Sequence, residues 1–254
     1  MSASGPAVLK IGVSEQVAVT AKVEMPARLG PETPVLILAH GANNDLDHPL
    51  LAAVGAHLSQ NTGCIVVRFN FPYVERGSGS PDSTPVLENT FKRVHDHVAD
   101  EIAAPGAPIF IGGKSLGGRI AAELISLGEE GEGLAAAGLV ELGYPLHRPG
   151  HKETLFTKPL RKIGVPSLFC IGGHDPFCDP DLLRPLLDRL LHPGRLYVVE
   201  GGDHSLHGAG AGKGRAGGND AAQTGADEGG ANEFKEVLEE VARFITEVVQ
   251  PPDR

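Results

Sequence analysis

The stretch "PIFIGGKSLGGRI", Pro108 to Ile120, says more about the fold than any other part of the chain. It begins as a short apolar run, breaks at paired glycines beside one serine, and continues with apolar residues at helical spacing. Two kinds of site combine a strand, a glycine-rich turn and a helix in this way. One is a loop that binds phosphate, and the other is a turn that holds a nucleophilic serine.

The glycine spacing argues against a phosphate loop. Residues Gly113 to Ser115 would form the end of the pattern G-x-x-x-x-G-K-[ST], and its first glycine would then fall on Pro108. Proline has no N–H to offer a phosphate, so the pattern fails where the chemistry needs it. The dinucleotide pattern G-x-G-x-x-G fails as well, because these glycines are spaced differently.

The remaining template is the nucleophile turn G-x-S-x-G, which has Ser115 at its centre. Strand and helix nearly touch at such a turn, so small residues must flank the serine. Gly113, Gly117 and Gly118 meet that requirement. We therefore predict that Ser115 is a catalytic nucleophile. The alternative is a glycine-rich turn that carries an incidental serine.

The length of the chain allows one sizeable domain or two small ones, and we expect one. With 254 residues and many aliphatic side chains, the chain can form one α/β domain over residues 1–254. The net charge of −10 and the lack of a basic stripe argue against nucleic acid or an anionic membrane as partners. Neither a signal peptide nor a membrane-spanning stretch is apparent. Three separated cysteines favour free thiols in a reducing compartment, which predicts a cytoplasmic protein.

Strand-like and helix-like segments alternate along the chain, which predicts a mostly parallel central sheet with helices on both faces. The first two predicted strands form an antiparallel pair. The predicted strands are Ala7 to Val13, Glu15 to Met25, Val35 to Gly41, Cys64 to Pro72, Pro108 to Gly113, Ala137 to Pro145, Pro166 to Asp175 and Gly194 to His204. The predicted helices are Leu50 to Gln60, Thr84 to Ala103, the segment after Ser115, Asp181 to Leu191 and Asn232 to Val249.

One long segment, residues 207–232, is dominated by glycine and small polar residues. Almost nothing in it can be buried, so we expect a flexible loop within the domain. It begins just after a predicted strand end, where it could serve either as a simple insertion or as a lid over the site.

Acyl-transfer chemistry at Ser115 needs an acid and a base, which in this order of elements follow as Asp or Glu and then His. The ends of two later strands supply Asp175 and His204, and we predict these as the acid and the base. Asp179 is an alternative to Asp175 as the acid. Asp203, the neighbour of His204, also remains a candidate for that role. The structural alternatives are a turn-capping aspartate and an exposed loop histidine.

The oxyanion of such a reaction needs backbone N–H donors. We predict one from Leu116, the residue after the nucleophile, and one from Ala42 in the loop after the strand "VLILAHG", with Gly41 or Asn43 as alternatives. An ordinary tight turn would also explain that loop. Several histidines and aspartates could converge on a metal, but no ligand spacing stands out, so we expect neither metal nor cofactor.

The chain as a whole resembles the α/β-hydrolases, and within them the small, lidless, dienelactone-hydrolase-like group of mostly bacterial predicted hydrolases. That group is related to the testis-expressed hydrolase-fold proteins of animals and to a chromatin-complex regulatory subunit. The resemblance implies an α/β-hydrolase fold without a large cap domain and the triad of Ser115, Asp175 and His204. It is carried by "LAHGAN" (Leu38 to Asn43), "VVRFNFPY" (Val66 to Tyr73), "PDSTPVL" (Pro81 to Leu87), "IGGKSLGGRIAA" (Ile111 to Ala122), "LGYPLHRPG" (Leu142 to Gly150), "HDPF" (His174 to Phe177) and "GGDHSL" (Gly201 to Leu206).

The same resemblance suggests which residues line the substrate site. With the oxyanion-loop alternatives included, the candidates are Gly41, Asn43, Arg68, Tyr73, Tyr144 and His147. Two segments depart from the group: residues 151–160, where relatives tend to carry Arg and His, and the glycine-rich loop, which is longer than expected.

These patterns predict a serine hydrolase that cleaves a small carboxylic ester or related acyl bond through an acyl-enzyme, with a small-molecule acyl substrate as its partner. One alternative is a catalytically idle hydrolase-fold module that binds proteins. Another is a thioesterase or acyltransferase with the same triad.

Overall fold

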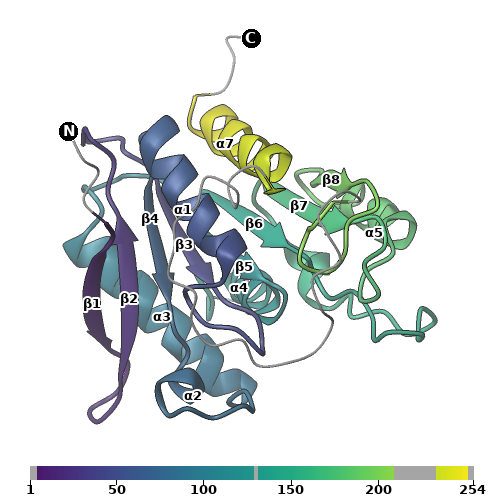
Figure 1. Ribbon diagram of the computed structural model, residues 1–254, viewed down its shortest axis with the longest axis horizontal. Coiled ribbons are helices and arrows are strands. Elements are labelled where there is room, and N and C mark those ends of the chain that lie inside the picture. Colours follow the sequence, from purple (N-terminus) through teal and green to yellow (C-terminus); the bar gives the residue numbers. More distant parts are fainter. Residues whose placement is uncertain (1–4, 129–130, 209–232, 251–254) are drawn as a thin grey trace.

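The computed structural model describes residues 5–128, 131–208 and 233–250. Figure 1 shows a twisted central sheet with helices packed on both of its faces. Most of the predicted glycine-rich loop, from residue 209 to residue 232, lies outside the described residues. None of the helices within the described ranges combines the length and the apolar character needed to cross a membrane.

The sheet has eight strands in the order β1-β2-β4-β3-β5-β6-β7-β8. The first pair is antiparallel, as predicted, and β2 also runs antiparallel to β4, whereas all other neighbours are parallel. The strands are β1 (Ala7–Gly12), β2 (Ala18–Glu24), β3 (Val35–Ala39), β4 (Ile65–Phe69), β5 (Ile109–Lys114), β6 (Gly138–Leu142), β7 (Ser167–Gly172) and β8 (Arg195–Val199).

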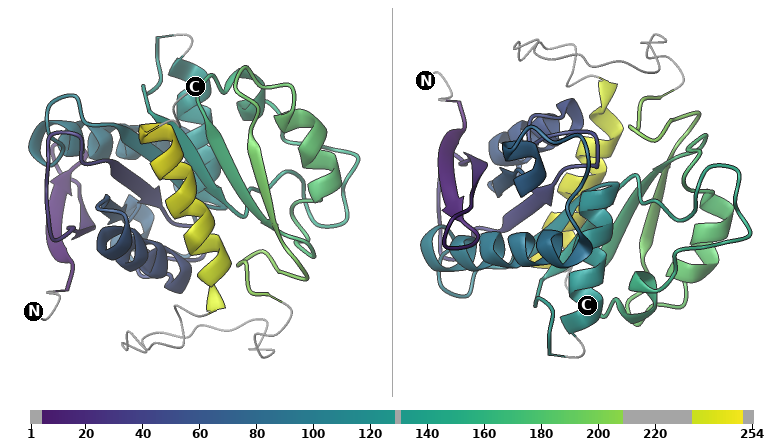
Figure 2. Two further views of the ribbon diagram at one scale, coloured as in Figure 1. Left: turned by 90° about the horizontal axis from the view of Figure 1, so that it is seen from above. Right: turned by 90° about the horizontal axis from the view of Figure 1, so that it is seen from below.

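The helices form one layer on each side of this sheet (Figure 2). Their bounds are α1 (Pro49–Asn61), α2 (Pro72–Glu75), α3 (Thr84–Glu101), α4 (Leu116–Gly128), the 3-10 helix η1 (Pro159–Lys162), α5 (Pro180–Leu187) and α7 (Lys235–Val249). Helices α1 and α7 pack on one face, and α3, α4 and α5 pack on the other, because their apolar side chains join separate buried clusters. Two short elements, α2 and η1, were not expected from the sequence, and α5 ends earlier than predicted, two residues after Pro185.

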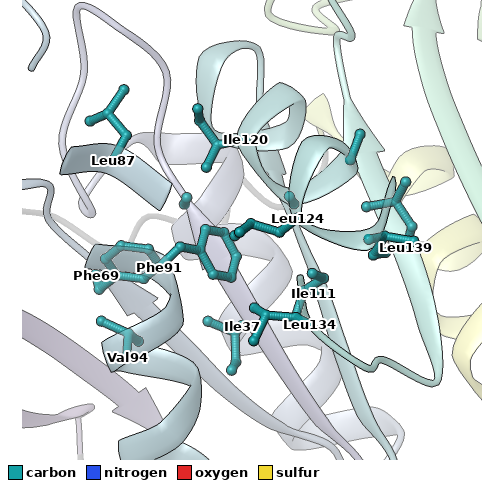
Figure 3. Close-up of a cluster of buried hydrophobic side chains, with 14 of the residues drawn as sticks. Ile37, Phe69, Leu87, Phe91, Val94, Ile111, Ile120, Leu124, Leu134 and Leu139 are labelled. Carbon is teal, nitrogen blue, oxygen red and sulfur yellow. The ribbon is translucent and has the colours of Figure 1, made fainter. Parts of the chain in front are cut away.

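The larger core lies between the sheet and helices α3 and α4 (Figure 3). Phe91 of α3 and Leu124 of α4 meet Ile37 of β3 and Ile111 of β5, and all four side chains are fully buried. Central parallel strands are covered on both faces, which explains why they read as continuous apolar runs. This packing fixes β5 and α4, the two elements that flank Ser115.

Candidate active site

Ser115 lies between the end of β5 and the start of α4, at the carboxyl edge of the parallel strands. Its φ of 51° is in the left-handed region, which few residues other than glycine adopt. The Ser115 N–H donates to the Leu142 carbonyl of β6 at 3.1 Å and anchors the turn to the neighbouring strand. Strain of this kind at a serine between strand and helix is the geometry of a nucleophile turn.

The glycines around Ser115 are needed because main chains meet there. A Cβ on Gly117 would overlap the Ala39 carbonyl oxygen and lie 2.6 Å from that of His40. One on Gly113 would lie 2.8 Å from the Gly117 carbonyl carbon. Real Cβ atoms do not approach backbone so closely, so the sequence-based reason for small residues at this turn holds in the structure.

The structure joins Ser115, His204 and Asp175 in one chain of hydrogen bonds. The Ser115 Oγ lies 2.9 Å from His204 Nε2, and His204 Nδ1 lies 2.8 Å from Asp175 Oδ2. The second carboxylate oxygen of Asp175 accepts the Phe177 N–H at 2.8 Å, so this carboxylate is held from both sides. The Phe177 ring packs on the imidazole with centroids 4.5 Å apart. Because Asp175 accepts from Nδ1–H, the Nε2 atom is free to accept the serine proton.

The two competing aspartates are engaged elsewhere. Asp179 caps α5 by accepting the Asp181 N–H, and it forms an ion pair with Lys152 at 2.6 Å. Asp203 accepts the N–H groups of Ser205 and His207 in a turn. The geometry therefore favours Asp175 over both as the partner of His204.

Two glycines let the loops that carry His204 reach the serine. Gly143, which follows β6, has a φ of 72°, and a Cβ there would lie 2.8 Å from the His204 carbonyl oxygen. A Cβ on Gly172, at the end of β7, would overlap the Asp203 carbonyl oxygen. Sequence reasoning did not single out either residue, although both follow strand ends, where close approach is common.

The loop after β3 lies beside Ser115. A Cβ built on Gly41 would lie 3.6 Å from the Ser115 Cβ, an ordinary contact distance. Within the described part of the chain, neither the Ala42 N–H nor the Leu116 N–H donates to a protein acceptor. Two unengaged N–H groups beside a serine are what an oxyanion needs. Asn43 is exposed at the outer end of this loop.

The other candidate lining residues are buried and hydrogen-bonded inside the protein. Arg68 pairs with Glu24 and donates to the Leu46 carbonyl. The structure thus gives these side chains supporting contacts behind the site. The remaining contacts join Tyr144 Oη to the Phe156 carbonyl oxygen at 3.1 Å, Tyr73 Oη to the Ala42 carbonyl oxygen at 2.8 Å, and His147 Nε2 to the Asp179 N–H at 3.2 Å.

Three titratable groups near the site, none of them predicted, have shifted pKa values. Lys114, next to the nucleophile, is 4% exposed; burial lowers the pKa of its ammonium group, while Asp175 and Asp203 oppose that shift. Burial also lowers the pKa of His48 to about 3. Glu141 of β6 is fully buried, and burial raises the pKa of its carboxyl well above the ordinary value.

The described residues contain no group of three or more His, Cys, Asp or Glu side chains placed to hold a metal ion. His40, which follows β3, uses both ring nitrogens in hydrogen bonds within the protein. The loop that follows β6 forms an open pocket of about 300 Å³. Its lining residues are Arg148, His151, Thr154 and Phe156.

A comparison with models of known protein families identifies the family of this chain. The model of a family described as "Alpha/beta hydrolase domain" matches residues 32–224, well over half of the chain. The chain belongs to this family. The match supports the prediction that this alpha/beta hydrolase is an enzyme, and it includes Ser115, Asp175 and His204.

Solved structures share the fold of this alpha/beta hydrolase at low sequence identity. Est1E from Butyrivibrio proteoclasticus matches with a TM-score of 0.69 and 14% identity, covering 97% of this chain and 99% of its own. XC6422 from Xanthomonas campestris is described as an α/β serine hydrolase without a lid. It matches with a TM-score of 0.68 and 15% identity, covering 98% of each chain. A dienelactone hydrolase from Anabaena variabilis matches with 0.65 and 16%, covering 96% of this chain and 98% of its own. The described residues likewise show no large cap domain between the strands of the sheet.

Proposed function

We propose that this protein is a serine hydrolase that cleaves small carboxylic esters through an acyl-enzyme on Ser115. One observation carries the proposal: the 2.9 Å contact between Ser115 Oγ and His204 Nε2, continued by the 2.8 Å contact from His204 Nδ1 to Asp175. An activated serine needs a base within hydrogen-bond reach and a third group to orient that base. All three groups lie at ends of the sheet strands, where α/β folds bind ligands.

In the first half of the reaction, Ser115 Oγ attacks the ester carbonyl while its proton passes to His204 Nε2. The negative charge that develops on the carbonyl oxygen is stabilised by the N–H groups of Ala42 and Leu116, and by the positive end of α4. Asp175 stays ionised and stabilises the imidazolium ion. His204 then gives its proton to the departing alcohol, and the acyl group remains on Ser115.

In the second half, a water molecule takes the place of the alcohol. His204 Nε2 removes a proton from the water as its oxygen attacks the acyl carbonyl. The same two N–H groups stabilise the second oxyanion, and the proton returns to Ser115 Oγ as the carboxylic acid leaves. The protein ends each cycle with its starting protonation.

The proposed substrate class is supported by the solved structures that share this fold. Solved structures with this fold include esterases, one of them bound to ferulic acid and another to propionate, and a dienelactone hydrolase. Small carboxylic esters or lactones are therefore the first compounds to test here. A thioesterase or acyltransferase would use the same three residues, and a comparison of ester, thioester and alcohol acceptors separates these chemistries.

The three cysteines do not compete with Ser115 as nucleophiles. Cys64, Cys170 and Cys178 are free and buried, and burial raises the pKa of the Cys64 and Cys170 thiols to about 12. Unpaired buried thiols also support our proposal that the protein works in a reducing compartment such as the cytoplasm.

The test is labelling with a fluorophosphonate, which reacts with activated serines. The expected result is one adduct on the wild-type protein, located on Ser115, and none on Ser115→Ala. His204→Ala should label far more slowly while keeping its circular dichroism spectrum. A folded wild-type protein that does not label would contradict the proposal and favour the idle, protein-binding module.

A further inference from the structure

The carbonyl group of Gly41, beside Ser115, is held by an unusual number of donors. They are the His40 ring nitrogen Nδ1 at 2.8 Å, the Asn44 N–H at 3.2 Å and the Tyr73 hydroxyl at 3.3 Å. The Tyr73 hydroxyl has one proton, which it shares between the Gly41 carbonyl oxygen and the nearer Ala42 carbonyl oxygen at 2.8 Å, so one side chain contacts both carbonyl groups of the loop. Two of these donors, His40 and Tyr73, come from buried side chains.

The tautomer of His40 follows from its second contact. The Phe71 N–H donates to His40 Nε2 at 3.0 Å, so that nitrogen carries no proton. The proton of the neutral ring is therefore on Nδ1, where it is donated to the Gly41 carbonyl. His40 is fully buried, and burial lowers its pKa although Asp45 opposes the shift. The ring thus links the oxyanion loop to the chain that follows β4.

The direction of the Gly41 carbonyl sets the direction of the next N–H. In a trans peptide the two point to opposite sides, and the described residues contain no cis peptide bond. Because the carbonyl points toward His40 and Tyr73, the Ala42 N–H points away from them. A rotation of this peptide would break the three hydrogen bonds to the carbonyl and remove one donor from the site.

We propose that His40 and Tyr73 are positioning residues that lock the Gly41–Ala42 peptide, so that the Ala42 N–H is available to the reaction oxyanion. The inference rests on the proposed function, because the oxyanion arises only if Ser115 attacks a carbonyl. Neither side chain touches the substrate. Both act through the Gly41 carbonyl, and their effect should appear in the transition state and not in the binding of the substrate.

Tyr73→Phe tests this directly, because it removes the hydroxyl and keeps the ring, whose centroid lies 5.7 Å from that of His40. Loss of a whole oxyanion donor costs about a hundredfold or more in kcat, and two donors would still hold the Gly41 carbonyl. We expect kcat for p-nitrophenyl acetate to fall about tenfold with KM within about twofold. The affinity for a trifluoromethyl ketone, which forms a tetrahedral adduct on serine, should fall in parallel.

Tyr197→Phe is the matched control, since its hydroxyl donates to Glu236 on the surface between β8 and α7. It should leave kcat and the ketone affinity unchanged. If Tyr73→Phe and Tyr197→Phe have the same kcat, or if kcat falls without a loss of ketone affinity, the positioning role is refuted. Melting temperatures of both variants separate a loss of catalysis from a loss of folded protein.

A second readout does not need activity. In ¹⁵N NMR spectra of the wild-type protein at neutral pH, His40 should be the neutral Nδ1–H tautomer, and its pKa should lie below that of an exposed histidine. The Ala42 amide should be rigid in the wild type and more mobile in Tyr73→Phe. An Nε2–H tautomer, or an Ala42 amide that is equally ordered in both proteins, would overturn the inference. This result stands even if the wild type fails to hydrolyse esters, which would refute only the proposed function.

Discussion

The buried carboxyl of Glu141, which packs against the helix that follows Ser115, should make the stability of the protein depend on pH. This carboxyl is fully buried on β6, and neither oxygen has a hydrogen-bond partner among the described residues. The side chain packs against the first turn of α4, because a Cβ added to Gly118 would overlap one of its carboxylate oxygens. Burial raises the pKa of this group well above its ordinary value of 4.5, so the folded protein keeps the carboxyl protonated to a higher pH than the unfolded chain does.

The consequence for stability has a definite sign. The unfolded chain releases the Glu141 proton above about pH 4.5, whereas the folded protein retains it, so the free energy of unfolding falls as the pH rises. While only the unfolded chain is ionised, each pH unit above the ordinary pKa lowers the free energy of unfolding by about 1.4 kcal/mol. This destabilisation is present throughout the window in which only the unfolded chain is ionised.

Glu141→Gln keeps the shape of the side chain and removes the titration. The free energy of unfolding of the variant, minus that of the wild type, should increase between pH 5 and pH 7, by at most about 1.4 kcal/mol per pH unit. Urea denaturation followed by circular dichroism at the two pH values measures this difference. Any pH-independent cost of burying the amide cancels in the comparison.

Glu153→Gln is the control, because its carboxyl is fully exposed in the loop after β6. It should show no gain of stability relative to the wild type as the pH rises. If Glu141→Gln and the wild type differ by the same amount at pH 5 and at pH 7, Glu141 is not held protonated and the reasoning from its burial is wrong.

Three further substitutions test the site itself. Asp175→Asn should lower kcat for p-nitrophenyl acetate about a thousandfold or more, with an unchanged circular dichroism spectrum, because an amide does not hold the required His204 tautomer; a loss below tenfold would contradict the role of this carboxylate. Gly117→Ala should lower the free energy of unfolding by about 2 kcal/mol in urea denaturation, since its Cβ would overlap the Ala39 carbonyl oxygen; wild-type stability would disprove the close approach. Ser115→Gly should be more stable than Ser115→Ala by about 1 kcal/mol, because Ser115 has a φ of 51°; equal melting temperatures of these two inactive variants would argue against strain at the turn.

Much of this architecture could be predicted because local patterns and topology act together. The apolar runs "VLILAHG" and "SLFCIGG" became the buried strands β3 and β7, and the parallel order brings their ends to one edge of the sheet. Asp175 and the loop with Ala42, which follow those strands, therefore lie near Ser115 in the structure, as the topology predicts. The glycines around Ser115 also predicted the tight turn, because a larger side chain does not fit at these positions.

The supporting residues were harder to predict because their roles depend on tertiary contacts. Arg68 and Tyr144 were suggested as lining residues, but the structure buries both and bonds them to internal partners. His40 stood at a strand end beside the expected oxyanion loop, yet its tautomer depends on the Phe71 N–H, which comes from another strand end. Glu141 did carry a signal that could have been used: a carboxyl inside the apolar run "GLVEL" must be buried if that strand is central.

The central claim is that Ser115 forms a covalent acyl-enzyme with the help of His204. Its most direct test is to quench the protein with acid during turnover of p-nitrophenyl acetate and to map the acetylated peptide by mass spectrometry. We predict one acetyl group, on Ser115, in the wild type, and none in Ser115→Ala, which should also lose turnover. Acetylation of another residue, or wild-type turnover by Ser115→Ala, would contradict the mechanism.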